Sequence, residues 1–419
     1  MPPLNVLVVG ASIAGPATAY WLSRIGARVT VIERFSQLRT GGQAVDVRTV
    51  GVSVMRETPG MEALVCAKST KEEGVSFVRE DGRPYGVIRA TGNPDQQSLI
   101  SEFEIYRGHL ARILVGLTQD NKQVNYIFNE QIASIRQKSS GGGPVTVKFT
   151  NGTTTSDYDL VVACDGTTSR TRAMGLSCRV RDHVVPTNNW AAYFSAKEDY
   201  LHGSLIGQGY SAPGGRFISI GSDPAGFSRI LLIAVNQQHE AINSYRNALD
   251  RGDAATRQHI EQYFKGSGWR SSAVLKDMMV AEDFYTSEIV QVKVPSLYHG
   301  RVVMVGDAGY ATGPTGGGTS LALAGAYMLA GEIGKHGGDL TKALVGYEQQ
   351  MRPLIKEMQK IPPFATTVLA PQTRTGIWLR NNVFAFIAWT GLVEYAQRLF
   401  GSAFASTDTY PLPEYKWKA

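Results

Sequence analysis

The sequence predicts an α/β protein in which a parallel sheet covered by helices carries an inserted, mostly antiparallel sheet, with helices at the C-terminal end. Three observations support this fold class. A strand–turn–helix–strand pattern occupies residues 4–33, glycine-containing turns follow apolar strands near residues 165 and 306, and apolar and polar residues alternate between 190 and 235. Because the apolar strands lie far apart in the chain, we expect the parallel sheet to be assembled from separated segments.

Composition indicates a soluble globular protein of two domains. The chain has 419 residues, of which 43% are hydrophobic and 19% charged. The net charge of +6 comes without a run of Lys or Arg, which argues against nucleic-acid binding and suits an anionic ligand. The three cysteines show no metal spacing and no disulfide pattern, so we expect no metal and a reducing, cytoplasmic location.

Two segments bear on targeting. The N-terminal residues "MPPLNVLVVG" enter a strand at once, so we expect no secretory signal. Val383–Val393 is apolar but shorter than the roughly 20 residues that span a bilayer. We expect a buried helix there, within a longer helix over Arg380–Phe400 that bridges the two domains. Peripheral membrane contact is the alternative.

The first pattern predicts a Rossmann-like nucleotide-binding unit. Leu4–Val9 is an apolar strand, Ala14–Arg24 has helical spacing, and Ala27–Glu33 is a second strand. Gly10 permits the tight turn between them, and the helix N-terminus can hold a pyrophosphate.

Side-chain size and charge in this unit suit a dinucleotide. Gly15 lets the helix pack close to the strands, and Ser12 is small enough for the backbone to approach a pyrophosphate. Glu33 is placed to accept a hydrogen bond from a ribose hydroxyl and would repel a ribose phosphate, which favours FAD or NAD over NADP. The adjacent Arg34 weakens the argument against NADP.

Two later motifs favour FAD. The strands Leu160–Ala163 and Arg301–Val305 end at Asp165-Gly166 and Gly306-Asp307, and the loop Gly313–Gly318 precedes a helix. Such a loop, with Pro314 followed by Gly316, Gly317 and Gly318, offers backbone N–H donors that would face the N1–C2=O edge of a flavin. Asp307 can bond a polyol but would repel a phosphate, so we place it on the ribityl chain.

These residues resemble the three signatures of single-component (class A) FAD-dependent aromatic hydroxylases, the group of flavoprotein monooxygenases that includes para-hydroxybenzoate hydroxylase. "GGQAVDVR", "EIYRGHLARIL" and "GTSLALAGAYMLAGEI" are most similar in style to its tetracycline-inactivating and polyketide-tailoring branch. The resemblance covers most of the chain and implies a glutathione-reductase-type FAD domain.

The resemblance also implies roles for single residues. Arg107 matches a family arginine near the flavin and pyrophosphate, Asp165-Gly166 a motif linked to FAD and NADPH, and Gly41 and Gly42 a loop near the flavin ring. Each has a structural alternative, as a surface arginine, a plain turn or an ordinary glycine loop. The cofactor-binding set is then Gly10, Ser12, Ala14, Gly15, Glu33, Arg34, Gly42, Arg107, Asp165, Asp307, Pro314, Gly316, Gly317 and Gly318. One departure is Tyr310, which stands where the family often has His.

The spacing of the motifs sets the expected domain order. The FAD-binding domain comprises residues 1–74, 101–180 and 291–345, the substrate-binding sheet residues 75–100 and 181–290, and the C-terminal bridging helices residues 346–419. Trp190–Ala196, Arg216–Ser222 and Ser228–Val235 alternate as antiparallel strands do, and residues 75–100 predict a hairpin that turns at Asp81-Gly82.

The implied reaction is monooxygenation. NADPH or NADH, as a transient co-substrate, reduces FAD, dioxygen adds at flavin C4a, and the hydroperoxide transfers one oxygen to an aromatic or polyketide-like small molecule. The protein must exclude water and polarise a phenol or enol. Candidates for the second task are Tyr193, Tyr210 and Arg216, with Trp190 beside them; the catalytic residues are otherwise unknown.

The same motifs also fit other functions. Baeyer–Villiger insertion or epoxidation would use the same cofactor motifs, and some proteins of this fold bind prenylated GTPases without redox chemistry. Neither the substrate, the choice between NADPH and NADH, nor the choice between monomer and homodimer follows from the sequence.

Overall fold

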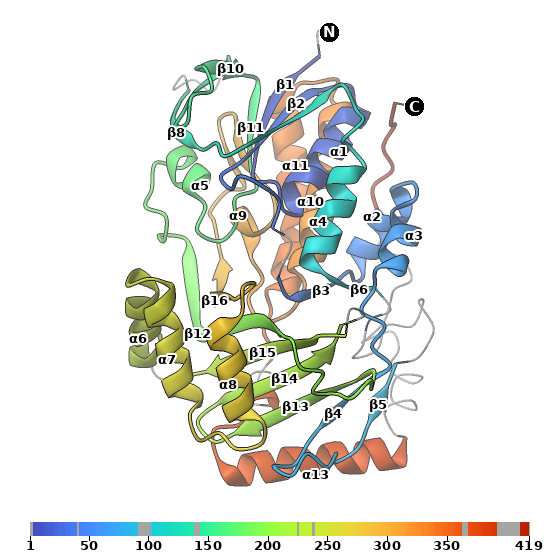
Figure 1. Cartoon of the computed structure of the whole chain (residues 1–419). Coiled ribbons are helices and arrows are strands. Elements are labelled where there is room, and N and C mark those ends of the chain that lie inside the picture. The colour runs from blue at the N-terminus through green and yellow to red at the C-terminus, as the bar shows by residue number, and fades with distance from the viewer. Residues whose placement is uncertain are drawn as a thin grey trace.

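The computed structural model describes residues 3–39, 42–90, 101, 103–137, 143–223, 226–236, 239–362, 368–391 and 411–418. Gly41, residues 91–100 of the expected hairpin and residues 392–400 of the expected C-terminal helix lie outside these ranges. Figure 1 shows two halves, one above the other, which we name after their sheets.

The parallel-sheet half is built on six strands. Their order is β17 (Tyr298–His299), β18 (Val302–Met304), β11 (Leu160–Ala163), β1 (Asn5–Val9), β2 (Arg28–Glu33) and β7 (Val124–Phe128). All neighbours pair in parallel except β17 and β18. The strands β1, β11 and β18 are almost entirely buried, as expected of a parallel sheet covered on both faces.

Helices and a small sheet cover the two faces. The helices of this half are α1 (Ala14–Arg24), α2 (Val50–Glu57), α3 (Met61–Ala67), α4 (Arg107–Gly116), α5 (Arg170–Gly175), α9 (Asp307–Tyr310), α10 (Gly318–Lys335) and α11 (Leu340–Met358). The small antiparallel sheet comprises β8 (Ile132–Arg136), β9 (Val145–Phe149) and β10 (Ser156–Tyr158), and its side chains pack on Leu7 and Ile32. A two-stranded ribbon, β3 (Ala44–Asp46) with β6 (Glu104–Tyr106), lies where the halves meet.

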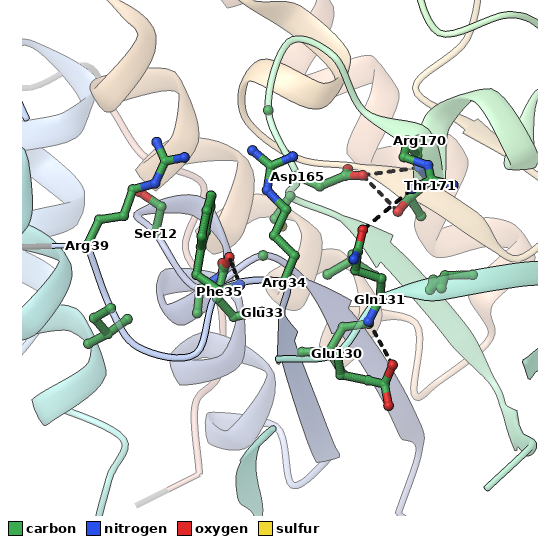
Figure 2. A pocket seen from close by; sticks show the side chains of 18 of the residues that line it. Ser12, Glu33, Arg34, Phe35, Arg39, Glu130, Gln131, Asp165, Arg170 and Thr171 are labelled. Carbon is green, nitrogen blue, oxygen red and sulfur yellow. Dashed lines mark hydrogen bonds between the residues drawn. The ribbon is translucent and has the colours of Figure 1, made fainter. Parts of the chain in front are cut away.

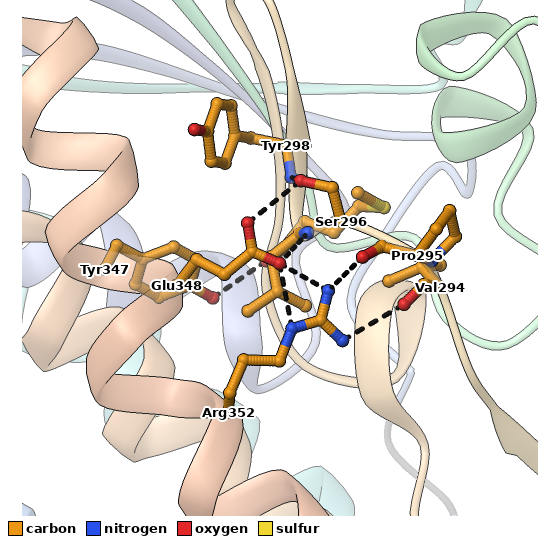
Figure 3. A network of polar contacts seen from close by, with 9 residues as sticks. Val294, Pro295, Ser296, Tyr298, Tyr347, Glu348 and Arg352 are labelled. Carbon is orange, nitrogen blue, oxygen red and sulfur yellow. Dashed lines mark hydrogen bonds and ion pairs between the residues drawn. The ribbon is translucent and has the colours of Figure 1, made fainter.

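A polar network fixes α11 against the segment that leads into β18 (Figure 3). Arg352 donates through Nη1 to the carbonyl of Val294 over 3.0 Å and through Nη2 to that of Pro295 over 2.7 Å. Glu348 accepts from the Ser296 hydroxyl and the Leu297 N–H over 2.9 and 3.1 Å. Because β18 ends at Met304, just before Gly306-Asp307, this clamp helps to position the third motif.

The antiparallel-sheet half contains seven strands. Their order is β16 (Tyr285–Val292), β12 (Val184–Ala196), β15 (Ser228–Val235), β14 (Arg216–Ser222), β13 (Ile206–Ala212), β4 (Gly74–Phe77) and β5 (Ile88–Arg89). Only β4 and β13 pair in parallel. Helices α6 (His239–Asp250), α7 (Asp253–Phe264) and α8 (Ser271–Val280) cover one face, where Trp190 stacks on Tyr245 at 5.0 Å between ring centroids.

The late apolar helix differs from expectation. Helix α13 runs from Arg374 to Thr390 and lies along the antiparallel-sheet half, where Arg380 donates to the Ser211 hydroxyl over 2.7 Å and the Phe384 ring packs edge-on to Phe77. The prediction of a buried helix was wrong for much of its surface, because Phe386 is 55% and Trp389 83% exposed. Apolar composition does not reveal which helix faces find a partner.

The C-terminal residues return to the parallel-sheet half. The Trp417 ring lies 4.5 Å from that of Trp21, and the Tyr415 hydroxyl donates to Glu332 over 2.9 Å. The contacts given for α13 are instead with the antiparallel-sheet half, so they do not make it the expected bridge. Within the described ranges, no helix has both the length and the apolar character needed to cross a bilayer.

Candidate cofactor site

A pocket opens at the carboxyl ends of β1, β2 and β11 (Figure 2). Its lining includes six of the residues expected to bind a cofactor, namely Gly10, Ser12, Glu33, Arg34, Arg107 and Asp165. They come from three distant parts of the chain. Parallel pairing of β1 with β2 and β11 brings the turns that follow these strands to one edge, and Arg107 is the first residue of helix α4. This edge is where open parallel sheets bind nucleotides.

Glu33 connects the glycine turn to the end of β2. Its carboxylate accepts hydrogen bonds from the N–H of Ala11 over 2.9 Å and the N–H of Phe35 over 3.1 Å. The side chain is half-buried and lines the pocket, so its remaining lone pairs can accept from a ligand hydroxyl.

Ala14 and Gly15 lie behind the turn and do not line the pocket. A Cβ added at Gly15 would collide with the carbonyl oxygen of Gly10, and a Cβ at Gly306 would lie 2.9 Å from that of Ala14. Small side chains here therefore allow helix α1 to meet the first turn and the third motif closely. Their expected contribution is to the shape of the site.

Four arginines that line the pocket lie outside ion-pair distance of every carboxylate among the described residues. Arg34, Arg39, Arg107 and Arg170 form no ion pair with any residue in the described part of the chain. Burial lowers the pKa of Arg39, and the charges of Arg107 and Arg34 lower it further. The Phe35 ring attracts two of these cations, with the guanidinium carbons of Arg34 and Arg39 at 4.8 and 4.2 Å from its centroid. Unpaired cations beside a helix N-terminus suit an anion such as a pyrophosphate.

Asp165 organises the second motif. It accepts from the Ser169 hydroxyl and, over 3.1 and 2.9 Å, from the N–H and hydroxyl of Thr171 at the start of α5. The fully buried Arg172 then donates to the carbonyl of Ala308 over 2.8 Å and to that of Thr167 over 2.9 Å. These bonds attach the second motif to the third.

Asp307 lies in a recess close to Arg107. The residue is exposed to solvent on one side, while protein atoms crowd its carboxyl group on the others. This desolvation raises the pKa of Asp307, and the positive charge of Arg107 acts in the opposite direction and lowers it. A Cβ added at Gly318 would lie 3.4 Å from an Asp307 oxygen, and one at Gly42 would lie 3.4 Å from the Cβ of Arg107. Gly42, Arg107, Asp307 and Gly318 therefore form one neighbourhood that adjoins the pocket.

The glycine-rich loop continues from this neighbourhood. Pro314 and Gly316 are exposed, and the Thr315 hydroxyl donates to the carbonyl of Met358 over 2.8 Å. Gly317 packs against the Met358 side chain, and Pro314 lines a second hollow next to β12. The loop therefore presents its exposed backbone on the side of the antiparallel sheet.

The candidate catalytic residues lie on two different faces of the antiparallel sheet, because successive residues of a strand point to opposite faces. The face covered by α6–α8 carries Trp190, Tyr210 and Arg216, because each of them pairs with a residue of that face. Arg216 also donates to the carbonyl of Tyr263 over 3.4 Å. Tyr193 pairs with Leu231 on the opposite face, and the charge of Arg107 acts on its hydroxyl. Only Tyr193 of the four therefore faces the recess.

Tyr310 is a core residue. Its hydroxyl lies 3.2 Å from that of Tyr347, which in turn donates to the carbonyl of Met304 over 2.8 Å. A Cβ at Gly325 would collide with the Tyr310 hydroxyl, so helix α10 needs a glycine at this point. The departure from the family pattern therefore lies in packing beneath the site.

Sequence reasoning missed Arg39, Phe35 and Arg170 as pocket residues. Arg39 follows the strand that ends at Glu33, and Arg170 follows the turn at Asp165. A search for cations just after each carboxyl-terminal turn of the sheet would have found both.

Comparison with known proteins identifies the class. A family model described as "FAD binding domain" matches residues 3–359. The chain is 33% identical over 417 residues to the FAD-dependent monooxygenase asL4 of Sarocladium schorii, covering 93% of each chain. It is 34% identical over 364 residues to a flavin-dependent monooxygenase of Legionella longbeachae, covering 85% of this chain and 87% of that one.

Solved structures agree with this class. The tetracycline destructase Tet(51) superposes with a TM-score of 0.79 at 28% identity, covering 99% of this chain and 100% of that one. Klebsiella pneumoniae HpxO, solved with FAD and uric acid, has a TM-score of 0.68 at 18% identity and covers 98% of each chain, which shows a common fold. Fold, site and relatives define a flavoprotein of the aromatic-hydroxylase type. The chain belongs to the FAD-binding domain family.

Proposed function

We propose that this protein is an FAD-dependent monooxygenase that uses NAD(P)H and O2 to hydroxylate an aromatic or polyketide-like small molecule. The observation that carries the proposal is the set of arginines, without an ion pair to any described residue, that are grouped with Glu33 at the carboxyl edge of the parallel sheet. An FAD-dependent monooxygenase also fits the names of relatives that match nearly the full chain, such as asL4.

The residues present suit FAD. Arg34, Arg39 and the N-terminus of α1 would hold the pyrophosphate, and Glu33 would accept from the adenosine ribose. Asp307 would bond the ribityl hydroxyls, because a carboxylate accepts hydrogen bonds from a polyol but would repel a phosphate. When bound, FAD supplies hydride acceptance and activation of dioxygen.

Tyr193 would position the substrate as a hydrogen-bond donor. Burial raises its pKa to about 12, an effect that Tyr285 adds to and Arg107 opposes. At neutral pH its hydroxyl therefore stays protonated, so it can donate to a substrate oxygen but not act as a general base.

Baeyer–Villiger insertion and epoxidation remain second candidates within the same class, since they need the same cofactor site. A non-redox binding protein of this fold is the candidate from a different class. It has no use for four pocket arginines that form no ion pair within the described part of the chain, which makes it the weaker proposal.

The test begins with the absorption spectrum of purified protein. We expect flavin bands at close to one FAD per chain, and NADPH oxidation that accelerates when a substrate is added. With isotopically labelled dioxygen, hydroxylation and Baeyer–Villiger insertion both give a product heavier by one oxygen, and fragmentation distinguishes them. A colourless protein that takes up no added FAD would contradict the proposal.

A further inference from the structure

A second hollow lies between the antiparallel sheet and the glycine-rich loop. Its volume is about 330 Å³, within the range of small-molecule sites. None of its lining residues is charged, and four carry carboxamides, namely Asn189, Asn236, Gln291 and Gln372. Pro314, of the loop proposed to face the flavin, lines it as well. We call it the carboxamide hollow.

Backbone contacts fix the orientation of the amides. Gln291, only 4% exposed, donates through Nε2 to the carbonyls of Thr312 and Gln359 over 3.0 and 2.7 Å. Gln372 donates through Nε2 to the carbonyl of Val235 over 2.8 Å. Because a backbone carbonyl can only accept a hydrogen bond, the amide nitrogen of each glutamine must be the end that faces it. The opposite end of each amide is therefore the oxygen Oε1, and neither Oε1 atom has a partner among the described residues.

In Asn189 the bonded end of the amide is the oxygen, and the free end is the amino group. Its Oδ1 accepts from the backbone N–H of Asn236 over 3.2 Å, which leaves the Nδ2 amino group without a partner in the described part of the chain. The residue is 3% exposed and follows a bulge in β12, where Asn188 has a φ of 61°. Bulges of this kind re-aim a side chain.

Asn236 shows what a purely structural amide looks like here. It donates through Nδ2 to the carbonyl of Asn188 over 3.0 Å and accepts from the Tyr263 hydroxyl over 2.8 Å, so both of its ends are used. The three amides with one free end differ from it, because each keeps one oriented polar group for a ligand.

We propose that the carboxamide hollow binds an uncharged, oxygen-bearing part of the substrate. A hydroxyl or N–H of the ligand would donate to Gln291 or Gln372, and a ligand carbonyl or ether oxygen would accept from Asn189. A carboxylate has no cation to pair with here and would face two amide oxygens, so the hollow selects against acids. This rests on the proposed function for the identity of the ligand as substrate, but the selection itself does not require FAD.

The test compares two ligands that share a ring and differ in charge. Resacetophenone carries a neutral methyl ketone where β-resorcylate carries a carboxylate, and both have the same two ring hydroxyls. Calorimetry on the purified full chain should show resacetophenone binding about tenfold or more tightly than β-resorcylate. Equal binding, tighter binding of the acid, or no binding of the ketone overturns the proposal.

The substitution Asn189→Asp locates the effect. It keeps the oxygen that accepts from Asn236 and replaces the free amino group with an oxygen, so affinity for resacetophenone should fall about tenfold or more. Asn247→Asp, on the exposed surface of α6, adds the same charge elsewhere and should change nothing. If Asn189→Asp binds resacetophenone like the unmodified protein, the proposal is wrong; if the variant does not fold, the two-ligand comparison decides it.

The flavin spectrum of the same sample separates the two proposals. A yellow protein without preference for the ketone contradicts only the carboxamide hollow. A colourless protein that keeps the preference and takes up no FAD contradicts only the monooxygenase proposal.

Discussion

Arg172 donates a hydrogen bond of 2.8 Å to the carbonyl oxygen of Ala308, and so joins the turn after β11 to the turn after β18. The guanidinium is fully buried and also donates to Thr167 and Val180. One side chain thereby holds in register two motifs that are more than a hundred residues apart in the chain.

We expect Arg172→Lys to weaken both the fold and the cofactor site. Lysine cannot reach the same carbonyls as a planar guanidinium, so buried acceptors lose their donors. The free energy of unfolding should fall by about 2–4 kcal/mol, with loss of FAD during purification. Denaturant titration and the flavin-to-protein absorbance ratio measure the two effects. Unchanged stability would show that water replaces the guanidinium without cost.

Removing a pocket cation should lower FAD affinity. Arg107→Gln should raise the Kd for FAD about tenfold, because a charge-assisted interaction contributes on the order of 1.5 kcal/mol. Arg112→Gln, on the exposed surface of the same helix, is the matched control and should leave the Kd unchanged. Fluorescence titration of apoprotein with FAD gives both values. Equal Kd values for the two variants would mean that the charge of Arg107 is not used.

Removing the carboxylate of Glu33 should lower the affinity of the protein for FAD. In Glu33→Ala the N–H groups of Ala11 and Phe35 lose their partner, and a ribose hydroxyl loses its acceptor. We expect the Kd for FAD to rise about tenfold to a hundredfold. Asp81→Asn, in an exposed turn of the other half, provides the comparison. An FAD affinity equal to that of the Asp81→Asn variant would rule out the ribose contact.

Tyr193 and Tyr210 form a matched pair on opposite faces of one sheet. Tyr193→Phe should reduce kcat/KM about tenfold while FAD content stays unchanged, because only a hydroxyl that positions the substrate is lost. Tyr210→Phe should have no effect on turnover, since Tyr210 lies on the face covered by helices, near Trp269. Because the pKa of Tyr193 is about 12, its contribution should not titrate between about pH 6 and 9. A larger effect at Tyr210 would reverse the assignment of the faces.

Protonation of Glu130 should lower the stability of the fold in acid. Although burial raises its pKa, hydrogen bonds from Thr153, Asn151 and Gln131 outweigh burial and lower it from 4.5 to about 2. A carboxyl group whose pKa is lower in the folded than in the unfolded protein stabilises the fold at a pH above its unfolded pKa. This stabilisation is lost as the pH falls from about 5 to about 2. The free energy of unfolding of the Glu130→Gln variant should therefore be lower by about 2–3 kcal/mol near pH 7 and converge with that of the unmodified protein near pH 2. Parallel curves across this range would exclude Glu130 as the source.

Local patterns in the sequence were sufficient for several elements of the parallel sheet. Helix α1 begins and ends at the expected residues, and β11 has the expected bounds, because continuous apolar runs and glycine turns are local signals. The membership of the chain in an FAD-binding family also followed from three short motifs. The expected site residues around Gly10, Glu33 and Asp165 meet in one pocket because parallel strands share a carboxyl edge.

Other features needed the tertiary structure. Sequence alternation identified the strands of the second sheet but not which face each side chain takes, so Tyr193, Tyr210 and Arg216 looked equivalent until pairing fixed their sides. The exposed surface of α13 and the return of Trp417 to Trp21 likewise depend on contacts between distant residues. The sequence by itself determined the local elements and the cofactor class, because these depend on neighbours in the chain. Only the fold decided which polar groups keep a free hydrogen-bonding end, as at Asn189 and Gln291, since that depends on partners far along the chain.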